Sequence, residues 1–435
     1  MRNRSFVSIG VTLGAALLLA SCTGGGGGTA QPTNAPTEGD DGALSGEITF
    51  QTWSLKNDTF TPYFEGVVKA FEDANPGTTI KWVDQPADGY EDKILQQAES
   101  GELPDVINLP PEYAFTLAKV GQLADLASVS SKLGDYVPGG IEAYTYDGIE
   151  GSFGFPWYLG TELNYWNTDL LQQGGVTEVP STIDETLDAA EKLAAANIQT
   201  LADIPSPKSL KIFISDQGGQ LDIFKDGTFG FNTPEAVKLV ERWAELYQLG
   251  AVSPDALQGA GTANSNINSF NKGTVAWTTA GPNYIDRDLA VNAPTLLPKI
   301  EVMSGFGTPP LFVQGITVSG VSKNPALALA FAEYVTNTDN QIEFVKLAPG
   351  FFPGTIAANA QPDAFVVASD YEKQNRANEL AADQMDRAAL INPPQFTEAM
   401  EGYAKQQIAL AVRGDITAQE ALDAAVAYAE QNLAE

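Results

Sequence analysis

The sequence contains no histidine, one cysteine and few basic residues. Without histidine the chain lacks the commonest metal ligand and the commonest general base at neutral pH, so its composition disfavours an enzyme. A single cysteine cannot form a disulfide within the chain, and stability must come from packing. The 24 lysines and arginines are outnumbered by 55 aspartates and glutamates, which gives a formal net charge of −31. This charge repels nucleic acid and anionic lipid headgroups and is compatible with an uncharged or cationic ligand.

The N-terminal segment is typical of a secretory signal. Two arginines precede an apolar run over residues 6–20, which is shorter than the roughly 20 residues needed to span a bilayer. Cys22 follows the sequence Leu-Ala-Ser in a pattern that resembles the bacterial lipobox. The resemblance implies that residues 1–21 are removed and that the thiol of Cys22 carries a lipid anchor to the cell membrane. An ordinary signal peptide with an incidental cysteine is the alternative.

Residues 22–44 are rich in glycine and polar residues and include five consecutive glycines. A segment of this composition cannot bury enough apolar surface to offset its ordering entropy, so we expect a flexible linker. As a random coil it would span on the order of 25 Å. The rest of the chain, about 390 residues from Gly46 onward, exceeds the usual size of one core and predicts two domains.

The body opens with alternating strand and helix patterns. Period-2 alternation over residues 48–53 predicts a strand, and apolar residues at helical spacing over 63–71 predict a helix. The same order repeats with strands over 79–83 and 104–109 and a helix over 90–101. This order predicts an α/β fold with a parallel sheet, in which ligands lie beyond the carboxyl ends of the strands.

Several segments together resemble the extracellular solute-binding proteins of sugar ABC importers, the group that includes maltose-binding proteins. Each segment is weakly specific alone, but their order and spacing are specific, and the resemblance covers nearly the whole mature chain. The segments are residues 48–53 ending in Trp53, 68–77 (VKAFEDANPG), 100–106 (SGELPDV), 121–126 (GQLADL), 154–156 with 164–171 (GFP and NYWNTDLL), 270–276 with 281–282 (FNKGTVA and GP), and 322–324 (SKN).

The resemblance implies two α/β domains in a type II periplasmic-binding-protein-like fold, joined by hinge crossings, with an interdomain ligand cleft. In this family the chain crosses near residues 146–155, again ahead of Val313 and a third time beyond Ala348. The N-terminal lobe would comprise 45–150 plus 298–348, and the C-terminal lobe 151–297 plus 349–435. Amphipathic patterns predict three further helices that cover the second lobe, over 371–389, 397–412 and 418–433.

A sugar site needs flat apolar faces for the C–H side of the pyranose ring and fixed polar groups for its hydroxyls. An unpaired buried polar group would cost about 1–3 kcal/mol. We expect aromatic and polar residues near strand ends and crossings to meet both needs. The candidate ligand-binding residues are Trp53, Lys56, Asp84, Glu112, Tyr113, Trp157, Tyr158, Thr161, Asn283, Gln314, Phe351 and Phe352, with Glu162 as an alternative to Thr161 and Phe306 as a weaker candidate.

Several of these positions also have structural explanations. Trp53 could pack in the sheet, Asp84 could lie in a solvated turn, and Phe351 with Phe352 could pack at a hinge. Asn283 stands where many family members carry a sugar-stacking tryptophan. This departure favours hydroxyl binding over an extended stacking platform.

The resemblance implies an extracytoplasmic solute-binding protein, a lipid-anchored monomer that closes around a mono- or oligosaccharide and delivers it to ABC permease subunits. No cofactor, metal or catalysis is expected. One alternative is a secreted carbohydrate-active hydrolase, which would need two carboxylates about 5–9.5 Å apart. Others are a binding protein for a polyol or another non-sugar solute, and a surface adhesin or sensor with the same fold.

Overall fold

The computed structural model describes residues 43–257 and 265–433. The predicted signal peptide, Cys22 and the linker up to residue 42 lie outside these ranges. Within them, no helix combines the length and the apolar character needed to cross a membrane.

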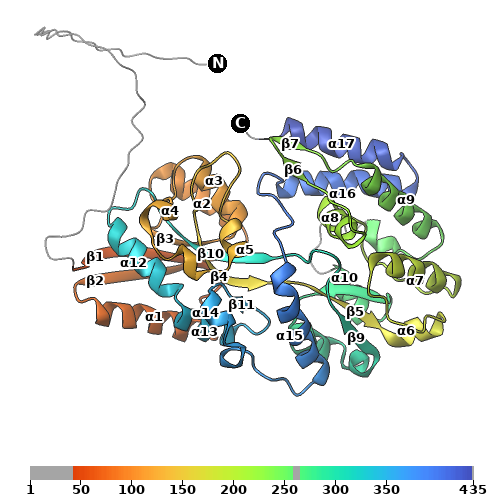
Figure 1. Ribbon diagram of the computed structural model, residues 1–435, viewed down its shortest axis with the longest axis horizontal. Coiled ribbons are helices and arrows are strands. Elements are labelled where there is room, and N and C mark those ends of the chain that lie inside the picture. The colour runs from red at the N-terminus through yellow and green to blue at the C-terminus, as the bar shows by residue number, and fades with distance from the viewer. Residues whose placement is uncertain (1–42, 258–264, 434–435) are drawn as a thin grey trace, which may run out of the picture. The chain divides into compact units, whose positions relative to one another are not determined.

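The larger sheet has six strands in the order β11-β4-β10-β3-β1-β2 (Figure 1). β1 pairs in parallel with β2 and β3, which confirms the predicted strands and their direction. β10 is antiparallel to β3 and β4, and β11 is antiparallel to β4, so the sheet is mixed rather than all parallel. The strands span Gly46–Trp53 (β1), Thr78–Gln85 (β2), Val106–Leu109 (β3), Phe155–Gly160 (β4), Phe312–Val318 (β10) and Phe352–Pro353 (β11).

Helices cover both faces of the larger sheet; Figure 1 shows α1 and α13 on one side and α2 and α3 on the other. Their apolar residues recur at helical spacing, so that α1 buries Phe64, Val67 and Phe71 against the sheet. The helices are α1 (Thr61–Ala74), α2 (Tyr90–Ser100), α3 (Pro111–Lys119), α4 (Leu126–Val129), α5 (Pro138–Glu142), α12 (Pro325–Val335), α13 (Thr338–Leu347) and α14 (Ile356–Asn359).

Aromatic side chains fill the core beneath this sheet. The ring of Phe64 lies 6.0 Å from Phe50, 5.8 Å from Trp157 and 6.1 Å from Phe344, measured between centroids. Burying one such side chain stabilises the fold by about 1.5–3 kcal/mol. The core therefore joins α1 and α13 firmly to strands β1 and β4.

The smaller sheet has three strands in the order β8-β5-β9, with both outer strands antiparallel to β5. The predicted C-terminal helices are present as α15, α16 and α17; α15 contacts β5 and β9, and α16 and α17 pack with α9. The elements are β5 (Leu163–Asn167), β6 (Phe224–Lys225), β7 (Thr228–Phe229), β8 (Trp277–Ala280), β9 (Ile300–Met303), α6 (Thr168–Gln173), α7 (Ile183–Ala195), α8 (Pro207–Asp216), α9 (Pro234–Gln248), α10 (Ser265–Asn271), α11 (Ala290–Asn292), α15 (Glu372–Gln384), α16 (Glu398–Arg413) and α17 (Ala418–Gln431), with the short 3₁₀ helices η2 (Pro254–Leu257), η4 (Pro294–Lys299) and η6 (Met385–Arg387) and the π-helix η3 (Ile285–Leu289). Two further 3₁₀ helices belong with the larger sheet: η1 (Leu133–Asp135), between α4 and α5, and η5 (Pro362–Ala364), which contacts α14.

The strand pairing shifts the predicted lobe boundaries. β4 and β11 lie in the larger sheet although we predicted them in the C-terminal lobe, and β9 lies in the smaller sheet although we predicted it in the N-terminal lobe. The chain therefore passes between the sheets at residues 161–162, 304–311 and 365–371. The described residues belong to one compact unit, and the division into two lobes stays a proposal. We call the two parts the large-sheet lobe and the small-sheet lobe.

Candidate functional site

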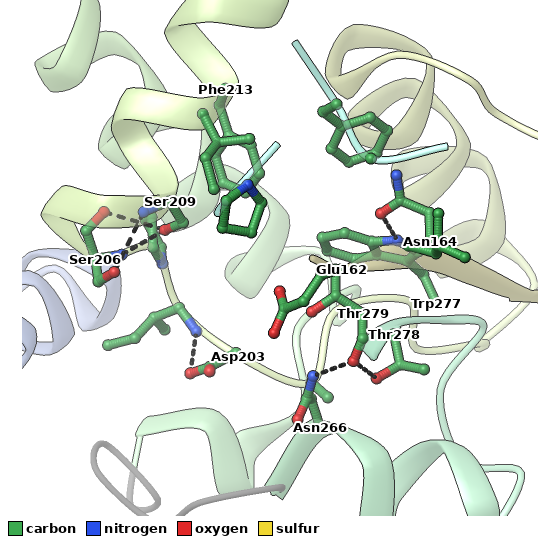
Figure 2. Close-up of a pocket in the computed structure, with 18 of the residues that line it drawn as sticks. Glu162, Asn164, Asp203, Ser206, Ser209, Phe213, Asn266, Trp277, Thr278 and Thr279 are labelled. Carbon is green, nitrogen blue, oxygen red and sulfur yellow. Dashed lines mark hydrogen bonds between the residues drawn. The ribbon is translucent and has the colours of Figure 1, made fainter. Parts of the chain in front are cut away.

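A pocket of about 160 Å³ opens beside the smaller sheet, where β5 and β8 meet the loop before α8. Figure 2 shows side chains from these elements turned toward a shared space. We call this the Trp277 pocket. Its aromatic lining residues are Phe213, Trp243, Trp277 and Phe306, and its polar ones include Glu162, Asn164, Asp203, Ser206, Ser209, Asn266, Thr278, Thr279 and Lys405.

The alternation of β8 explains why Trp277 and Thr279 face the pocket. Successive side chains of a strand point to opposite faces. Trp277 and Thr279 are half-buried, whereas Thr278 and Ala280 between and after them are buried. The indole N–H of Trp277 donates to Oδ1 of Asn164 at 3.0 Å, which fixes the ring in place.

Two phenylalanines extend the aromatic wall. The ring of Phe306 lies 5.8 Å from Trp277 and 6.3 Å from Phe213. Phe306 comes from the crossing segment 304–311 and Phe213 from α8, so three separate parts of the chain form one apolar surface. Phe306, a weaker candidate from the sequence, is therefore a pocket residue.

Glu162 points into the pocket from the first crossing segment (Figure 2). It is half-buried, because part of its surface still contacts water while protein atoms surround the carboxyl. This desolvation raises the pKa of Glu162, and the polar Thr279 side chain partly opposes the rise. The carboxyl therefore binds a proton more tightly than the carboxyl of a fully solvated glutamate does.

The backbone behind Glu162 is fixed by Gln384 at the end of α15. The amide nitrogen of Gln384 donates to the Thr161 hydroxyl and to the Glu162 carbonyl, both at 2.7 Å, and its amide oxygen accepts from Gly305 N–H at 2.8 Å. A Cβ atom on Gly305 would lie 2.9 Å from the Glu162 carbonyl oxygen, so this approach requires glycine. The hydroxyl of Thr161 is thus used inside the protein.

Asp203 supplies a second carboxyl to the pocket. Its Oδ1 accepts from the Ile204 N–H at 2.9 Å, and its carbonyl accepts from the Trp243 indole at 3.2 Å. Burial raises the pKa of Asp203, while the charge of Lys405 lowers it. The loop then enters α8 through a capping box between Ser206 and Ser209, which holds it against the helix.

Two lysines balance the charge near Asp203. Lys405 lies 3.7 Å and Lys208 lies 2.5 Å from the carboxylate of Glu401. Asp203 with Glu401 gives two negative charges, and Lys208 with Lys405 gives two positive ones. This part of the wall is close to neutral.

Several predicted residues of the large-sheet lobe gather around Tyr90. Trp53 stacks on Tyr90 at 5.7 Å, and its indole N–H has no hydrogen-bond partner among the described residues. Tyr113 lies 6.5 Å from the same ring. Asp84 accepts from the Thr52 hydroxyl and from two backbone N–H groups, including that of Lys56. Asp84 therefore shapes the loop after β1.

Glu112 links this cluster to the small-sheet lobe. It is exposed to water, yet protein atoms crowd its carboxyl, as expected for a side chain in a concavity. Burial raises the pKa of Glu112, Lys208 of α8 lowers it and Glu398 of α16 raises it. The first turn of α3 thus lies within electrostatic reach of the helices beside the Trp277 pocket.

Other predicted residues pack inside the large-sheet lobe. Trp157 has no exposed surface and contacts Phe344 at 4.3 Å, and Phe352 is 6% exposed. Both are core residues, and we leave them out of the proposed site. Tyr158 is half-buried between Phe344 and Phe351 at 5.1 and 5.0 Å, which agrees with the hinge-packing alternative for Phe351.

Two predicted amides also have internal partners. The Asn283 side chain donates to the Pro349 carbonyl at 2.9 Å. The chain is tightly packed here, because a Cβ atom on the next residue, Gly350, would lie 2.7 Å from the Cβ of Asn283. The Gln314 side chain accepts from Asn108 at 3.2 Å. Neither residue lines the Trp277 pocket.

Sequence reasoning missed most of the Trp277 pocket. Trp277 lies four residues before the Gly281-Pro282 pair, and we considered only Asn283, after the pair, as a ligand-binding position. Asp203 lies in a loop marked by two prolines, Pro205 and Pro207, ahead of a helix cap, which was the available signal. Within the described ranges, no cluster of three or more acidic, histidine or cysteine side chains could hold a metal ion.

Comparisons with known proteins agree on one family. The profile of the bacterial extracellular solute-binding proteins matches residues 66–374, more than half of the chain. The arabinooligosaccharide-binding protein of Halalkalibacterium halodurans is 23% identical over 331 residues, which are 72% of this chain and 73% of the relative.

Solved structures share the fold across almost their full lengths. The cyclic alpha-maltosyl-1,6-maltose binding protein of Arthrobacter globiformis has a TM-score of 0.69 and 19% identity, over 89% of this chain and 99% of that chain. The GacH receptor of Streptomyces glaucescens, solved unliganded and with acarbose, has a TM-score of 0.68 and 21% identity, over 90% and 99%. The chain belongs to the bacterial extracellular solute-binding proteins and has their type II periplasmic-binding-protein fold.

Proposed function

We propose that this chain is the extracytoplasmic solute-binding subunit of an ABC importer and that it binds a carbohydrate in the Trp277 pocket. The observation that carries the proposal is the Trp277 ring, fixed by Asn164 beside the hydrogen-bonding groups of Glu162, Asp203 and Asn266. An aromatic face suits the C–H side of a pyranose, and placed polar groups suit its hydroxyls. The names of the arabinooligosaccharide-binding and maltosyl-maltose-binding relatives support a saccharide.

The second half of the site would come from the large-sheet lobe. Trp53, Lys56, Asp84, Glu112 and Tyr113 surround the carboxyl ends of β1, β2 and β3, and Glu112 is within electrostatic reach of Lys208 across the lobes. A ligand that contacts both halves binds the closed state better than the open one, and this difference drives closure. The closed form would then be recognised by the permease.

The test is binding of a saccharide panel to wild type and to Trp277→Ala, by thermal shift and calorimetry. The panel contains arabinose oligosaccharides, maltose, cellobiose and their monosaccharides, beside polyols, peptides and phosphodiesters. A ligand at 100 times its Kd adds about 2.7 kcal/mol to the free energy of unfolding. We expect at least one saccharide of the panel to stabilise the wild-type protein in this way. Trp277→Ala should weaken the affinity for that saccharide about tenfold or more, and Trp277→Phe should recover part of the lost affinity.

The control is Tyr371→Ala, which removes an exposed aromatic ring outside the pocket. A panel in which only a non-sugar solute stabilises the protein would overturn the carbohydrate proposal. Equal binding by wild type and Trp277→Ala would overturn the pocket assignment.

A secreted hydrolase is the second candidate, because Glu162 and Asp203 place two carboxyls with raised pKa values in one pocket. We propose that the pair binds rather than hydrolyses, in keeping with the relatives named as binding proteins. Sustained release of nitrophenol from nitrophenyl glycosides, lost in Glu162→Gln, would favour the hydrolase instead.

We also propose that Cys22 is acylated and that the monomeric protein is held at the cell membrane beside its permease. The lipobox-like sequence before Cys22 supports this. Incorporation of radiolabelled palmitate that persists in a Cys22→Ala variant would contradict the assignment.

A further inference from the structure

Glu162 differs from the other charged residues of the Trp277 pocket in its charge balance. Among residues 43–257 and 265–433, the charged side chains that line the pocket are Glu162, Asp203 and Lys405. The positive charge of Lys405 stabilises the ionised form of Asp203. The neighbouring Glu401 forms ion pairs with Lys208 and Lys405. No lysine or arginine of the described chain forms an ion pair with Glu162.

The backbone on both sides of this carboxyl is fixed by hydrogen bonds. Gln384 donates to the Glu162 carbonyl at 2.7 Å. A second amide, Asn266, fixes the Thr279 carbonyl at 3.1 Å. The segments that carry Glu162 and Thr279 therefore need little ordering when a ligand binds.

An uncompensated carboxylate among aromatic rings favours a cation. Burial of a charge without a partner is costly, and a positive ligand group placed beside it removes that cost. The rings of Trp277 and Phe306 add attraction, because a cation within about 6 Å of an aromatic face is stabilised by its quadrupole. The net charge of −31 also raises the local concentration of cations.

We propose that the Trp277 pocket takes a saccharide with a free, protonated amino group, and that Glu162 is the carboxylate that pairs with it. This inference rests on the proposed carbohydrate function and specifies the ligand class. Hydrogen-bonding groups and aromatic faces recognise the sugar ring, whereas the Glu162 carboxylate selects the amine over a hydroxyl.

The experiment is calorimetry at about pH 6, where a free sugar amine is protonated. It compares sugars that differ only in the group at C2: glucose with glucosamine, galactose with galactosamine, and cellobiose with fully deacetylated chitobiose. N,N′-diacetylchitobiose is added because it keeps the nitrogen but not the charge. We expect at least one amino member to bind about tenfold or more tighter than its neutral and acetylated counterparts, which corresponds to about 1.4 kcal/mol.

Two variants assign that preference to Glu162. Glu162→Gln keeps the shape and an acceptor oxygen but removes the charge, so within this variant each amino sugar should bind no more tightly than its neutral counterpart. Glu178→Gln removes one charge from an exposed loop position outside the pocket, and the preference should persist. Melting temperatures of both variants show that each is folded.

Each remaining outcome overturns the inference at a different level. Neutral sugars that bind as tightly as amino sugars would remove the amine requirement and leave the carbohydrate function standing. If Glu162→Gln still prefers amino sugars, the protonated amine pairs with another carboxylate and the role given to Glu162 is wrong. The same measurement on Asp203→Asn would then test whether Asp203 is that carboxylate. Failure of every saccharide, charged or neutral, would overturn the carbohydrate function itself.

Discussion

Gln384 ties two chain crossings to one helix. Its side chain is 1% exposed, and its amide bonds the Thr161 hydroxyl, the Glu162 carbonyl and the Gly305 N–H. Thr161 and Gly305 belong to different passages of the chain between the two sheets. A single amide thus sets the point at which both passages leave the small-sheet lobe, and it orients Glu162.

Gln384→Ala should lower the free energy of unfolding by about 2–4 kcal/mol, because it leaves one buried and two partly buried polar groups without their partner. Gln361→Ala removes an exposed glutamine with one backbone bond, to the Ala357 carbonyl, and should change stability by less than about 0.5 kcal/mol. Urea unfolding followed by tryptophan fluorescence measures both. Equal midpoints for the two variants would show that the network carries little energy.

Single residues also mark the limit of sequence reasoning about the site. Trp157 and Trp277 both follow turn-rich segments, and nothing local distinguishes them. Trp157 is buried by Phe64 and Phe344, which are about 90 and 190 positions away, whereas Trp277 faces a pocket formed by α8 and the 304–311 crossing. Exposure depends on partners that are distant in sequence, so it could not be read from the neighbours of either tryptophan.

At the scale of elements, local patterns predicted much of the fold. The strands β1, β2 and β3 and the helices α1, α2, α15, α16 and α17 carry clear periodicity, and all were expected near their observed bounds. Assignment of strands to sheets was harder. β11 has two residues, and β4 and β9 pair with strands about 150 and 135 residues away. Such pairings depend on the assembled sheet and leave no local pattern.

The crossing at residues 304–311 depends on backbone conformation. Gly307 has φ of +45°, and a Cβ there would lie 2.3 Å from the Ser215 hydroxyl and 2.4 Å from the Asp216 nitrogen. Its N–H donates to the Asp216 carboxylate at 2.9 Å, and Arg387 donates to its carbonyl. The crossing is therefore held between the end of α8 and η6.

Two glycine substitutions should change stability in opposite directions. Gly307→Ala should lower the free energy of unfolding by about 2 kcal/mol or more, because the side chain is strained and has no space. Gly402 lies inside α16, and no atom would lie within 4 Å of a Cβ added there. Gly402→Ala should therefore raise the free energy of unfolding by about 0.5–1 kcal/mol. Thermal melts compare both with wild type. A stabilising Gly307→Ala would contradict the tight crossing.

For the whole molecule, the excess of acid has a structural consequence. Burial raises the pKa values of Glu91, Glu112, Glu162 and Asp203, and all four lie at the pocket or at the α2–α3 surface beside Glu398. Desolvated carboxylates are therefore concentrated where we propose that the lobes meet the ligand. Other acids, such as Glu185 and Glu420, have lowered pKa values because they accept helix-capping hydrogen bonds.

These opposite shifts predict a pH dependence that Glu162→Gln isolates. A carboxyl with a raised folded-state pKa binds its proton more tightly in the folded than in the unfolded chain. Its contribution to stability is fully present below the unfolded pKa, about 4.3 for glutamate, and is lost as the pH rises through the folded pKa. Glutamine does not titrate, so Glu162→Gln should gain melting temperature relative to wild type as the pH rises from about 4.5 to about 7.5.

Matched melts across this pH range, without ligand, measure the difference. Glu178→Gln serves as the control, because it removes the same charge from the global balance at an exposed position. The melting temperature of Glu178→Gln differs from that of wild type only through charge repulsion within a molecule of net charge −31. Subtracting this difference leaves the effect of the surroundings of Glu162 on the melting temperature. A difference in melting temperature between the two variants that does not change with pH would contradict this prediction. It would show that the Glu162 carboxyl is as well solvated in the folded protein as in the unfolded chain, so that a bound cation would offset no desolvation cost.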